Sequence, residues 1–348
     1  MSVDLETDFE RTRVALEFPF TIARGTRTHA EIAIVEIEDE AGHVGVGAAA
    51  PASRYGETVD TVEAVLPDLL AIVEDVGDPH DLARIERRMR DRIRANPSAR
   101  AAVSIAVYDL VAKRLEVPLY RYFGLDPTDA PETSYTIGID DLDRMRAKTE
   151  TALERGYDTL KVKVGTDRDE EILATIRDVA PDATIRVDAN EAWSPREAVA
   201  TIDELAAYDL EFVEQPVSAD DPEGLRYVYE RSSLPIAADE SLRTATDVPQ
   251  VADRCDVATL KLMKCGGLSE ARRIVHTAHA HGLEVMCGCM VESNASIAAA
   301  CQLAPALEYA DLDGSLLLEA DPYDGVSMPD GRIDLDGLER PGTGALER

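Results

Sequence analysis

Lysine is scarce in this 348-residue sequence, where it makes up only six of the 36 basic residues. Four of the six lie in two short motifs, KVK at 161–163 and KLMK at 261–264. Because arginine supplies nearly all the other positive charge, these two motifs stand out as candidate functional segments.

Positive charge as a whole is also deficient, since 68 acidic residues outweigh the basic ones and give a net charge of −32. Such a surface repels nucleic-acid phosphates and anionic lipid headgroups. We therefore expect neither nucleic acid nor a membrane as a partner. With 45% hydrophobic residues the chain is not a disordered acidic tail, and its acidity resembles that of proteins adapted to high salt.

Paired cysteines and long apolar runs are lacking as well. Five cysteines are an odd number in a chain large enough to fold without disulfides, so we expect reduced, buried thiols. No run approaches the roughly 20 apolar residues that span a bilayer, and the first residues, MSVDLETDFERTR, are acidic. These features predict a cytoplasmic protein.

Residues 1–125 predict an α+β domain. A β-hairpin pattern at 31–50 surrounds the turn DEAGH, and helical patterns follow at 57–76, 81–94 and 99–117. Residues 126–320 instead alternate short apolar runs with helix-length stretches, which predicts a parallel sheet.

Eight such strand–helix units favour a closed barrel of TIM type, with the chemistry at the carboxyl ends of its strands. An open doubly wound sheet is the alternative, but no strand is followed by a glycine-rich phosphate-binding turn. Residues 321–348 are rich in Gly, Pro and Asp, and we expect them to return to the N-terminal domain.

Five successive predicted strands end in an ionisable residue, at intervals of 22 to 26 residues. One strand–helix repeat has about that length, so all five side chains should point into one barrel mouth. The five are Lys163, Asp188, Glu214, Asp239 and Lys261.

Three carboxylates at close range predict a divalent-metal site, because they cannot all stay ionised without a cation. Oxygen ligands alone suit Mg²⁺, with Mn²⁺ as the common substitute. The alternative is that Asp188, Glu214 and Asp239 are solvated acids of an acidic protein.

The lysines on either side of this site are candidate general bases if a neighbouring charge or the metal lowers their pKa. Lys161 shares a strand face with Lys163, so it would disfavour the Lys163 ammonium or bind a substrate carboxylate. Lys264 lies three residues beyond Lys261 and has packing or loop anchoring as its expected role. The chemistry predicted is abstraction of a proton α to a carboxylate, with inversion.

The motifs KVK, DAN, EQP, ADES and KLMKCGG, in this order, resemble the enolase superfamily in its muconate-lactonizing-enzyme-like branch. The resemblance implies an α+β capping domain on a modified (β/α)7β barrel and a homo-oligomer. It also implies that Lys163 and Lys261 are the acid/base pair and that Asp188, Glu214 and Asp239 bind Mg²⁺.

Within this branch the sequence looks most like the dipeptide epimerases. Asp311 and Asp313 in ADLDG resemble the acids that receive the dipeptide ammonium group, although an acidic loop would look similar. CMVES at 289–293 resembles the end of the seventh strand in that subgroup. The further residues expected at the substrate are Thr136, Lys161, Met290, Glu292 and Ser293, with Arg24, Arg54 and Tyr55 in loops of the cap.

The function that the resemblance implies is a Mg²⁺-dependent epimerase acting on the C-terminal residue of an L,L dipeptide, with L-Ala-L-Glu as the reference substrate. Arg24 would suit a Glu side chain there. The alternatives are o-succinylbenzoate synthase, muconate cycloisomerase and N-succinylamino acid racemase, whose substrates lack the ammonium group. A non-catalytic binding protein would leave both lysines and all three acids unexplained.

Overall fold

The computed structural model describes residues 4–348, and its N-terminal part is an antiparallel sheet covered by helices. The strands β1 (Leu5–Ile22), β2 (Gly25–Asp39) and β3 (Val44–Ala49) lie in that order. The hairpin expected around DEAGH is confirmed as β2–β3. The long strand β1 was not predicted, because it is an edge strand with many exposed polar residues and no continuous apolar alternation.

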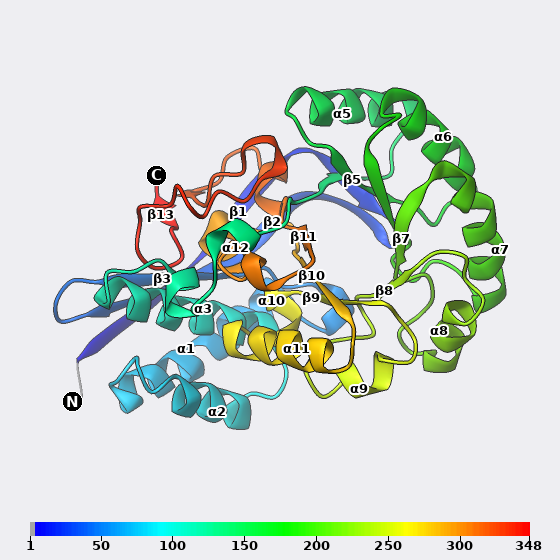
Figure 1. Ribbon diagram of the computed structural model, residues 1–348. Helices are drawn as coiled ribbons and strands as arrows, with labels where there is room; N and C mark the ends of the chain where they lie inside the picture. The colour runs from blue at the N-terminus through cyan, green and yellow to red at the C-terminus, as the bar shows by residue number, and fades with distance from the viewer. Residues whose placement is uncertain (1–3) are drawn as a thin grey trace.

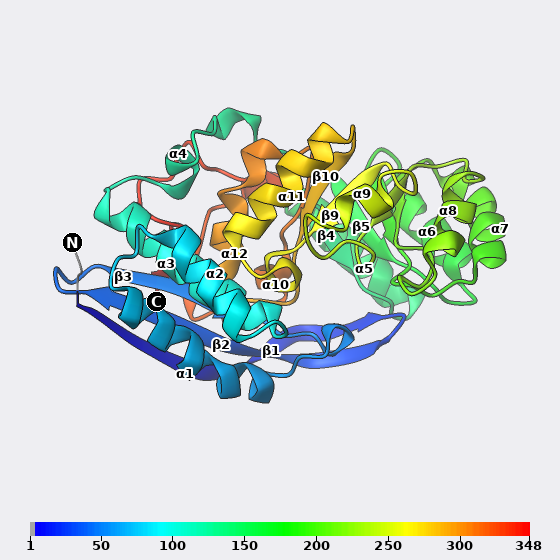
Figure 2. The ribbon, with the colours of Figure 1, turned by 90° about the horizontal axis from the view of Figure 1, so that it is seen from below.

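Three helices follow the sheet, α1 (Val59–Val76), α2 (Leu82–Arg92) and α3 (Pro97–Arg114). Helix α3 is almost completely buried, because it lies between the sheet and the barrel (Figure 2). It approaches β3 so closely that a Cβ added at Gly47 would lie 2.2 Å from the carbonyl oxygen of Ala102. Glycine is therefore required there by space.

Residues 135–311 contain eight parallel strands that form a barrel. Each strand hydrogen-bonds to the next in chain order, and a parallel bridge between Thr133 and Ala310 brings the two ends of the sheet together. This arrangement confirms the expected fold class. The strands are β4 (Tyr135–Ile137), β5 (Thr159–Lys163), β6 (Thr184–Asp188), β7 (Leu210–Glu214), β8 (Ile236–Ala238), β9 (Val257–Leu260), β10 (Glu284–Gly288) and β11 (Tyr309–Asp311).

Helices surround this barrel on the outside, as Figure 1 shows for α5 to α9. Helix α6, for example, buries Ile172, Leu173 and Ile176 on one face, the spacing that an amphipathic helix requires. The short helix α4 (Leu119–Tyr122) links the two parts of the chain. The barrel helices are α5 (Leu142–Glu154), α6 (Asp169–Val179), α7 (Pro195–Leu205), α8 (Pro222–Tyr229), α9 (Val248–Val251), α10 (Leu262–Cys265), α11 (Leu268–Ala280) and α12 (Asn294–Cys301).

The C-terminal segment contacts the N-terminal elements. Its two short strands, β12 (Tyr323–Asp324) and β13 (Leu346–Glu347), pair antiparallel. The backbone N–H of Thr343 donates a 2.6 Å hydrogen bond to the buried carboxylate of Asp109 in α3. In residues 4–348 no helix is long and apolar enough to cross a membrane.

We predict that Gly47→Ala lowers the free energy of unfolding by about 1–3 kcal/mol, because the new methyl group must displace backbone atoms of α3. Urea unfolding followed by circular dichroism measures the change. Glu38→Ala, at an exposed position of β2, is the control and should change stability by less than about 0.5 kcal/mol. Equal stability of Gly47→Ala and the unmodified protein would show that α3 can move away without cost.

Candidate active site

The five predicted ionisable residues lie at the carboxyl ends of five consecutive barrel strands. Lys163, Asp188 and Glu214 are the last residues of β5, β6 and β7, while Asp239 and Lys261 directly follow β8 and β9. The register pairs Lys163 with Asp188 and Asp188 with Glu214. All five side chains are buried.

Each of the three carboxylates is paired with a lysine. The Nζ of Lys163 lies 2.6 Å from Oδ2 of Asp188, and the Nζ of Lys261 lies 2.7 Å from Oδ2 of Asp239. Glu214 is 2.6 Å from the Nζ of Lys161. The buried charges therefore compensate one another in pairs, which burial requires.

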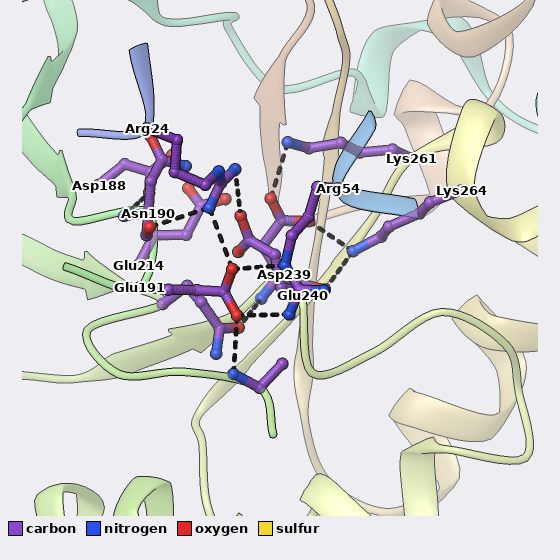
Figure 3. A network of polar contacts seen from close by, with 12 residues as sticks. Arg24, Arg54, Asp188, Asn190, Glu191, Glu214, Asp239, Glu240, Lys261 and Lys264 are labelled. Carbon is purple, nitrogen blue, oxygen red and sulfur yellow. Dashed lines mark hydrogen bonds and ion pairs between the residues drawn. The ribbon is translucent and has the colours of Figure 1, made fainter. Parts of the chain in front are cut away.

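Lys264 anchors the same region from behind. Its fully buried Nζ lies 2.5 Å from Oδ1 of Asp239 and donates to the backbone carbonyls of Asp239 and Thr259, at 2.5 and 2.7 Å (Figure 3). The ammonium thus has three acceptors and ties the end of β8 to β9. This geometry agrees with the anchoring role expected from its position.

The pKa values of the three carboxyl groups diverge although all are buried. Burial raises the pKa of Asp188, but Lys163 opposes it and the net pKa is lowered. The pKa of Asp239 is driven far below its ordinary range, because Lys261 and Lys264 together outweigh burial. For Glu214 burial prevails and raises the pKa to about 7. The site therefore contains more buried negative charge than its lysines fully compensate.

Several oxygen atoms at the mouth fit a metal ion. Among residues 4–348, the buried side-chain oxygens without a hydrogen-bond partner include both of Glu214, Oδ2 of Asp239, Oδ1 of Asn190 and Oε2 of Glu240. Hard oxygen donors of this kind suit Mg²⁺. In the described chain no three acidic, histidine or cysteine side chains are already gathered as a metal requires, and the acids contact lysines instead.

Asp311 and Asp313 lie at the end of β11, on the other side of Lys161. Asp311 accepts hydrogen bonds from Lys161 at 2.7 Å and from Ser134 at 2.6 Å, while Asp313 accepts one from the backbone N–H of Thr136 at 2.6 Å. Burial, and next the charge of Asp311, raise the pKa of Asp313 to about 7. A cation beside the two acids would relieve this repulsion.

Lys161 does not line the cavity described below. It is fully buried and lies within 3.4 Å of Asp188, Glu214 and Asp311. Burial lowers its pKa, but Asp311 and Glu214 oppose burial and raise the pKa well above the ordinary value. Lys161 is therefore a buried cation that links the acids, and its predicted contact with a substrate carboxylate stays a prediction.

A cavity of about 370 Å³ lies between the barrel mouth and the cap. From the barrel it is lined by Lys163, Asp239, Lys261, Asp311 and Asp313, and also by Thr136 and Met290. From the cap it is lined by the β1–β2 turn and by the 3₁₀ helix η1 (Ser53–Tyr55). The two lysines, Lys163 and Lys261, therefore face the same space as Asp311 and Asp313.

Two residues of the CMVES motif lie outside this lining. The buried carboxylate of Glu292 accepts hydrogen bonds from the N–H of Met290 at 2.8 Å and from the hydroxyl of Ser296 at 2.5 Å, and burial raises its pKa to about 7. Ser293 caps α12 and donates to Asp321. Both therefore shape the end of β10 from within and do not contact the cavity.

Arg24 and Arg54 line the cavity and also form ion pairs with glutamates of the barrel, and their contact with a substrate side chain stays a prediction. Arg24 lies 2.7 Å from Glu240, and Arg54 makes two contacts with Glu191, at 2.6 and 2.7 Å (Figure 3). Tyr55 lines the cavity, with the guanidinium of Arg243 5.1 Å from its ring centre.

Sequence reasoning missed Glu191 and Glu240. Their position in the sequence was the available signal. Glu191 lies three residues after Asp188 in DANE, and Glu240 directly follows Asp239 in ADES.

This capped barrel has the architecture of the enolase superfamily, and comparison with family models confirms the predicted resemblance. The model described as "Mandelate racemase / muconate lactonizing enzyme, N-terminal domain" matches residues 5–124, and "Enolase C-terminal domain-like" matches residues 144–345. The chain belongs to the mandelate racemase and muconate lactonizing enzyme group of this superfamily.

Individual relatives cover nearly the whole chain. The L-Ala-D/L-Glu epimerase of Bacteroides thetaiotaomicron is 40% identical, over 95% of this chain and 85% of its own. The dipeptide epimerase of Enterococcus faecalis V583, solved with Mg and L-Leu-L-Tyr, has a TM-score of 0.90 at 37% identity, with 99% of each chain covered. An N-succinyl Arg/Lys racemase from Bacillus cereus reaches 0.93 at 27% identity, over 100% of this chain and 96% of its own.

We predict that Lys264→Met lowers the free energy of unfolding by about 3–5 kcal/mol, because it leaves Oδ1 of Asp239 and two backbone carbonyls without their buried partner. Lys148→Met is the matched control. Its ion pair with Asp140, at 3.2 Å, reaches solvent, so the loss should stay near about 1 kcal/mol. Chemical denaturation of both variants makes the comparison, and similar losses would contradict an anchoring role for Lys264.

Proposed function

We propose that the protein is a dipeptide epimerase, an isomerase that inverts the α-carbon of the C-terminal residue of an L,L dipeptide by a two-lysine 1,1-proton transfer. The observation that carries the proposal is the cavity in which Lys163, Lys261, Asp311 and Asp313 face one another. The epimerases among its relatives support the same reaction class.

The two lysines are suited to opposite faces of a substrate. They end strands β5 and β9, which are four strands apart in a ring of eight and so lie across the barrel from each other. One Nζ takes the α-proton and the other returns a proton to the opposite face, which inverts the centre. The neighbouring Asp188 and Asp239 hold these Nζ atoms in place.

The oxygens of Glu214 and Asp239 that accept no hydrogen bond support these two acids as ligands of Mg²⁺. Asp188, on the neighbouring strand β6, is the proposed third ligand. When bound, the ion would neutralise these acids and stabilise the negative charge that develops on the substrate carboxylate.

The pKa of Lys261 also bears on its proposed role as a base. Burial lowers this pKa, but Asp239 opposes burial and raises it well above the ordinary value. When the charge of Asp239 is taken up, this pKa falls, and a larger fraction of Lys261 is the neutral amine that can accept a proton.

Asp311 and Asp313 are the proposed acceptors of the dipeptide ammonium group. Two buried acids two residues apart, one with its pKa raised to about 7, form a site that a positive group stabilises. The second candidate is N-succinylamino acid racemisation, favoured by the structural likeness to the N-succinyl Arg/Lys racemase. Its substrate would bring a carboxylate or amide to these acids in place of a cation.

The preferred side chains, Mn²⁺ substitution, assembly into a homo-oligomer and cytoplasmic location stay predictions. A substrate library should include both L-Ala-L-Glu and L-Leu-L-Tyr, because relatives are named for or solved with these different types.

We predict that Lys163→Ala and Lys261→Ala each reduce epimerisation by about 10²- to 10⁴-fold, because each removes one of the two proton-transfer groups. Proton NMR in D₂O with Mg²⁺ and the dipeptide library follows both epimerisation and α-proton exchange. Each variant should retain exchange with at most one epimer, and the two variants should retain opposite ones.

Calorimetric titration with Mg²⁺ is the control for these variants, since binding should persist in both. Normal turnover in either variant would contradict the two-base mechanism. Absence of exchange across the whole library in the unmodified protein, with Mg²⁺ bound, would favour the N-succinyl substrates or a lyase reaction.

We predict that Asp313→Asn lowers kcat/KM for dipeptides by about 10- to 100-fold, because it removes the charge that pairs with the ammonium group. N-acetylated dipeptides, which lack this charge, are the matched control substrates and should lose far less. Steady-state kinetics measures kcat/KM for both substrate series and gives the ratio of the free to the N-acetylated dipeptide. An unchanged ratio would remove Asp313 from the proposed ammonium site.

A further inference from the structure

Two turns of the cap are tied to the barrel by arginine–glutamate pairs (Figure 3). The turn between β1 and β2 carries Arg24, and the 3₁₀ helix η1 carries Arg54. Their partners are Glu191, in the loop after β6, and Glu240, in the loop after β8. These contacts join four segments that are far apart in the sequence.

Glu191 is the acceptor that both arginines share. Its Oε2 lies 2.6 Å from Nε of Arg54 and 3.2 Å from Nη1 of Arg24. Its Oε1 accepts from Nη2 of Arg54 at 2.7 Å and from the backbone N–H of Ala219 at 2.8 Å. One carboxylate therefore contacts both turns. Displacement of either arginine removes a charge from the acceptor that holds the other arginine.

Arg24 also reaches the loops that carry two of the proposed metal ligands. Its Nη2 lies 2.7 Å from Glu240, the residue after Asp239, and its Nη1 donates to the carbonyl of Asn190 at 2.9 Å. Asn190 in turn donates two hydrogen bonds to Asp188, at 2.9 and 3.1 Å. The cap therefore contacts the metal-ligand loops within one or two residues of the ligands.

The loop after β6 has an unusual backbone at this point. Asn190 and Glu191 have φ values of 46° and 70°, in the left-handed region that non-glycine residues disfavour. Such conformations persist where surrounding contacts over-determine them. The loop after β6 is also packed closely against its neighbours. A Cβ added at Gly165 would lie 2.4 Å from Ala192 of this loop and 3.2 Å from Ala23 of the β1–β2 turn.

Burial differs on the two sides of these pairs. The side chains of Glu240 and Glu191 are 1% and 9% exposed, whereas those of Arg24 and Arg54 are 34% and 31% exposed. An open hollow of about 590 Å³, lined by Arg24, Arg54 and Glu191, reaches the pairs of Glu191, whereas Glu240 lines the active-site cavity. The arginines can therefore withdraw to solvent, while the glutamates stay in the barrel.

We propose that Arg24, Arg54, Glu191 and Glu240 form a shared latch that closes both cap turns onto the barrel as one unit. The arginines are then positioning residues, which hold the turns over the cavity and the ligand loops in place. The proposal concerns the site of the proposed function and rests on that function only for its effect on turnover.

Hydrogen exchange of the full-length protein, followed by mass spectrometry, tests the latch without any substrate. In Arg54→Met, a shared latch predicts about tenfold faster exchange in peptides covering 50–58 and also in peptides covering 20–29. Glu191→Gln keeps the shape of the shared acceptor but removes its charge, and should have the same effect on both turns. Arg54→Lys, which keeps the charge, should restore part of the protection.

Arg88→Met is the matched control, because it removes an ion pair within the cap, to Asp75 at 2.5 Å, that does not reach the barrel. It should leave both turns unchanged. Faster exchange at 50–58 alone in Arg54→Met would overturn the proposal, since the turns would then close independently. Faster exchange spread evenly over α1 and α3 would also overturn it, because the pair would then stabilise the whole cap.

Kinetics with the preferred dipeptide adds a readout that a structural role would not move. Loss of the latch should raise KM several-fold and lower kcat less, because substrate enclosure weakens while both lysines remain. If the protein turned over no dipeptide at all, the proposed function would fail, and the exchange experiment would still decide the latch.

Discussion

Pairing of buried charge at the barrel mouth is the constraint on which the rest of this structure depends. Three carboxylates, two more at the end of β11 and four lysines occupy a region with almost no solvent exposure. Neither the carboxylates nor the lysines could be buried without the opposite charge beside them. The lysines scarce elsewhere are concentrated here because each has a buried acid to compensate, and the surface of the protein uses arginine instead.

The barrel topology gathers these paired charges at one place, where they can act together on a substrate. Parallel strands bring residues some 25 positions apart to one rim, so charges that are remote in sequence become neighbours. At this rim the pKa of Asp239 lies far below its ordinary range, while that of Glu214 is raised to about 7. Groups whose pKa values are driven apart in this way are typical of sites that move protons.

Much of this arrangement could be predicted from the sequence, because it follows from the hydrophobic period of the strands and helices and from the regular interval between strand ends. The barrel, the β2–β3 hairpin and the five strand-end residues all have local patterns. The ion pairs of Lys161 do not, since they join it to acids far away in the sequence. Strand β1 lacks a clear apolar alternation, and the burial of Glu292 among Met290 and Ser296 has no sequence pattern of its own. Likewise, an arginine in a loop could not be assigned to Glu191 without the folded chain.

Helix α3 has a wider consequence for how the chain is built. One face packs on the antiparallel sheet, while Ala101, Ile105 and Tyr108 belong to the same apolar cluster as the barrel residues. The hydrophobic core thus runs without interruption from one architectural unit into the other. A cap transplanted from a relative would therefore pack well only on a barrel whose surface is complementary to its own α3.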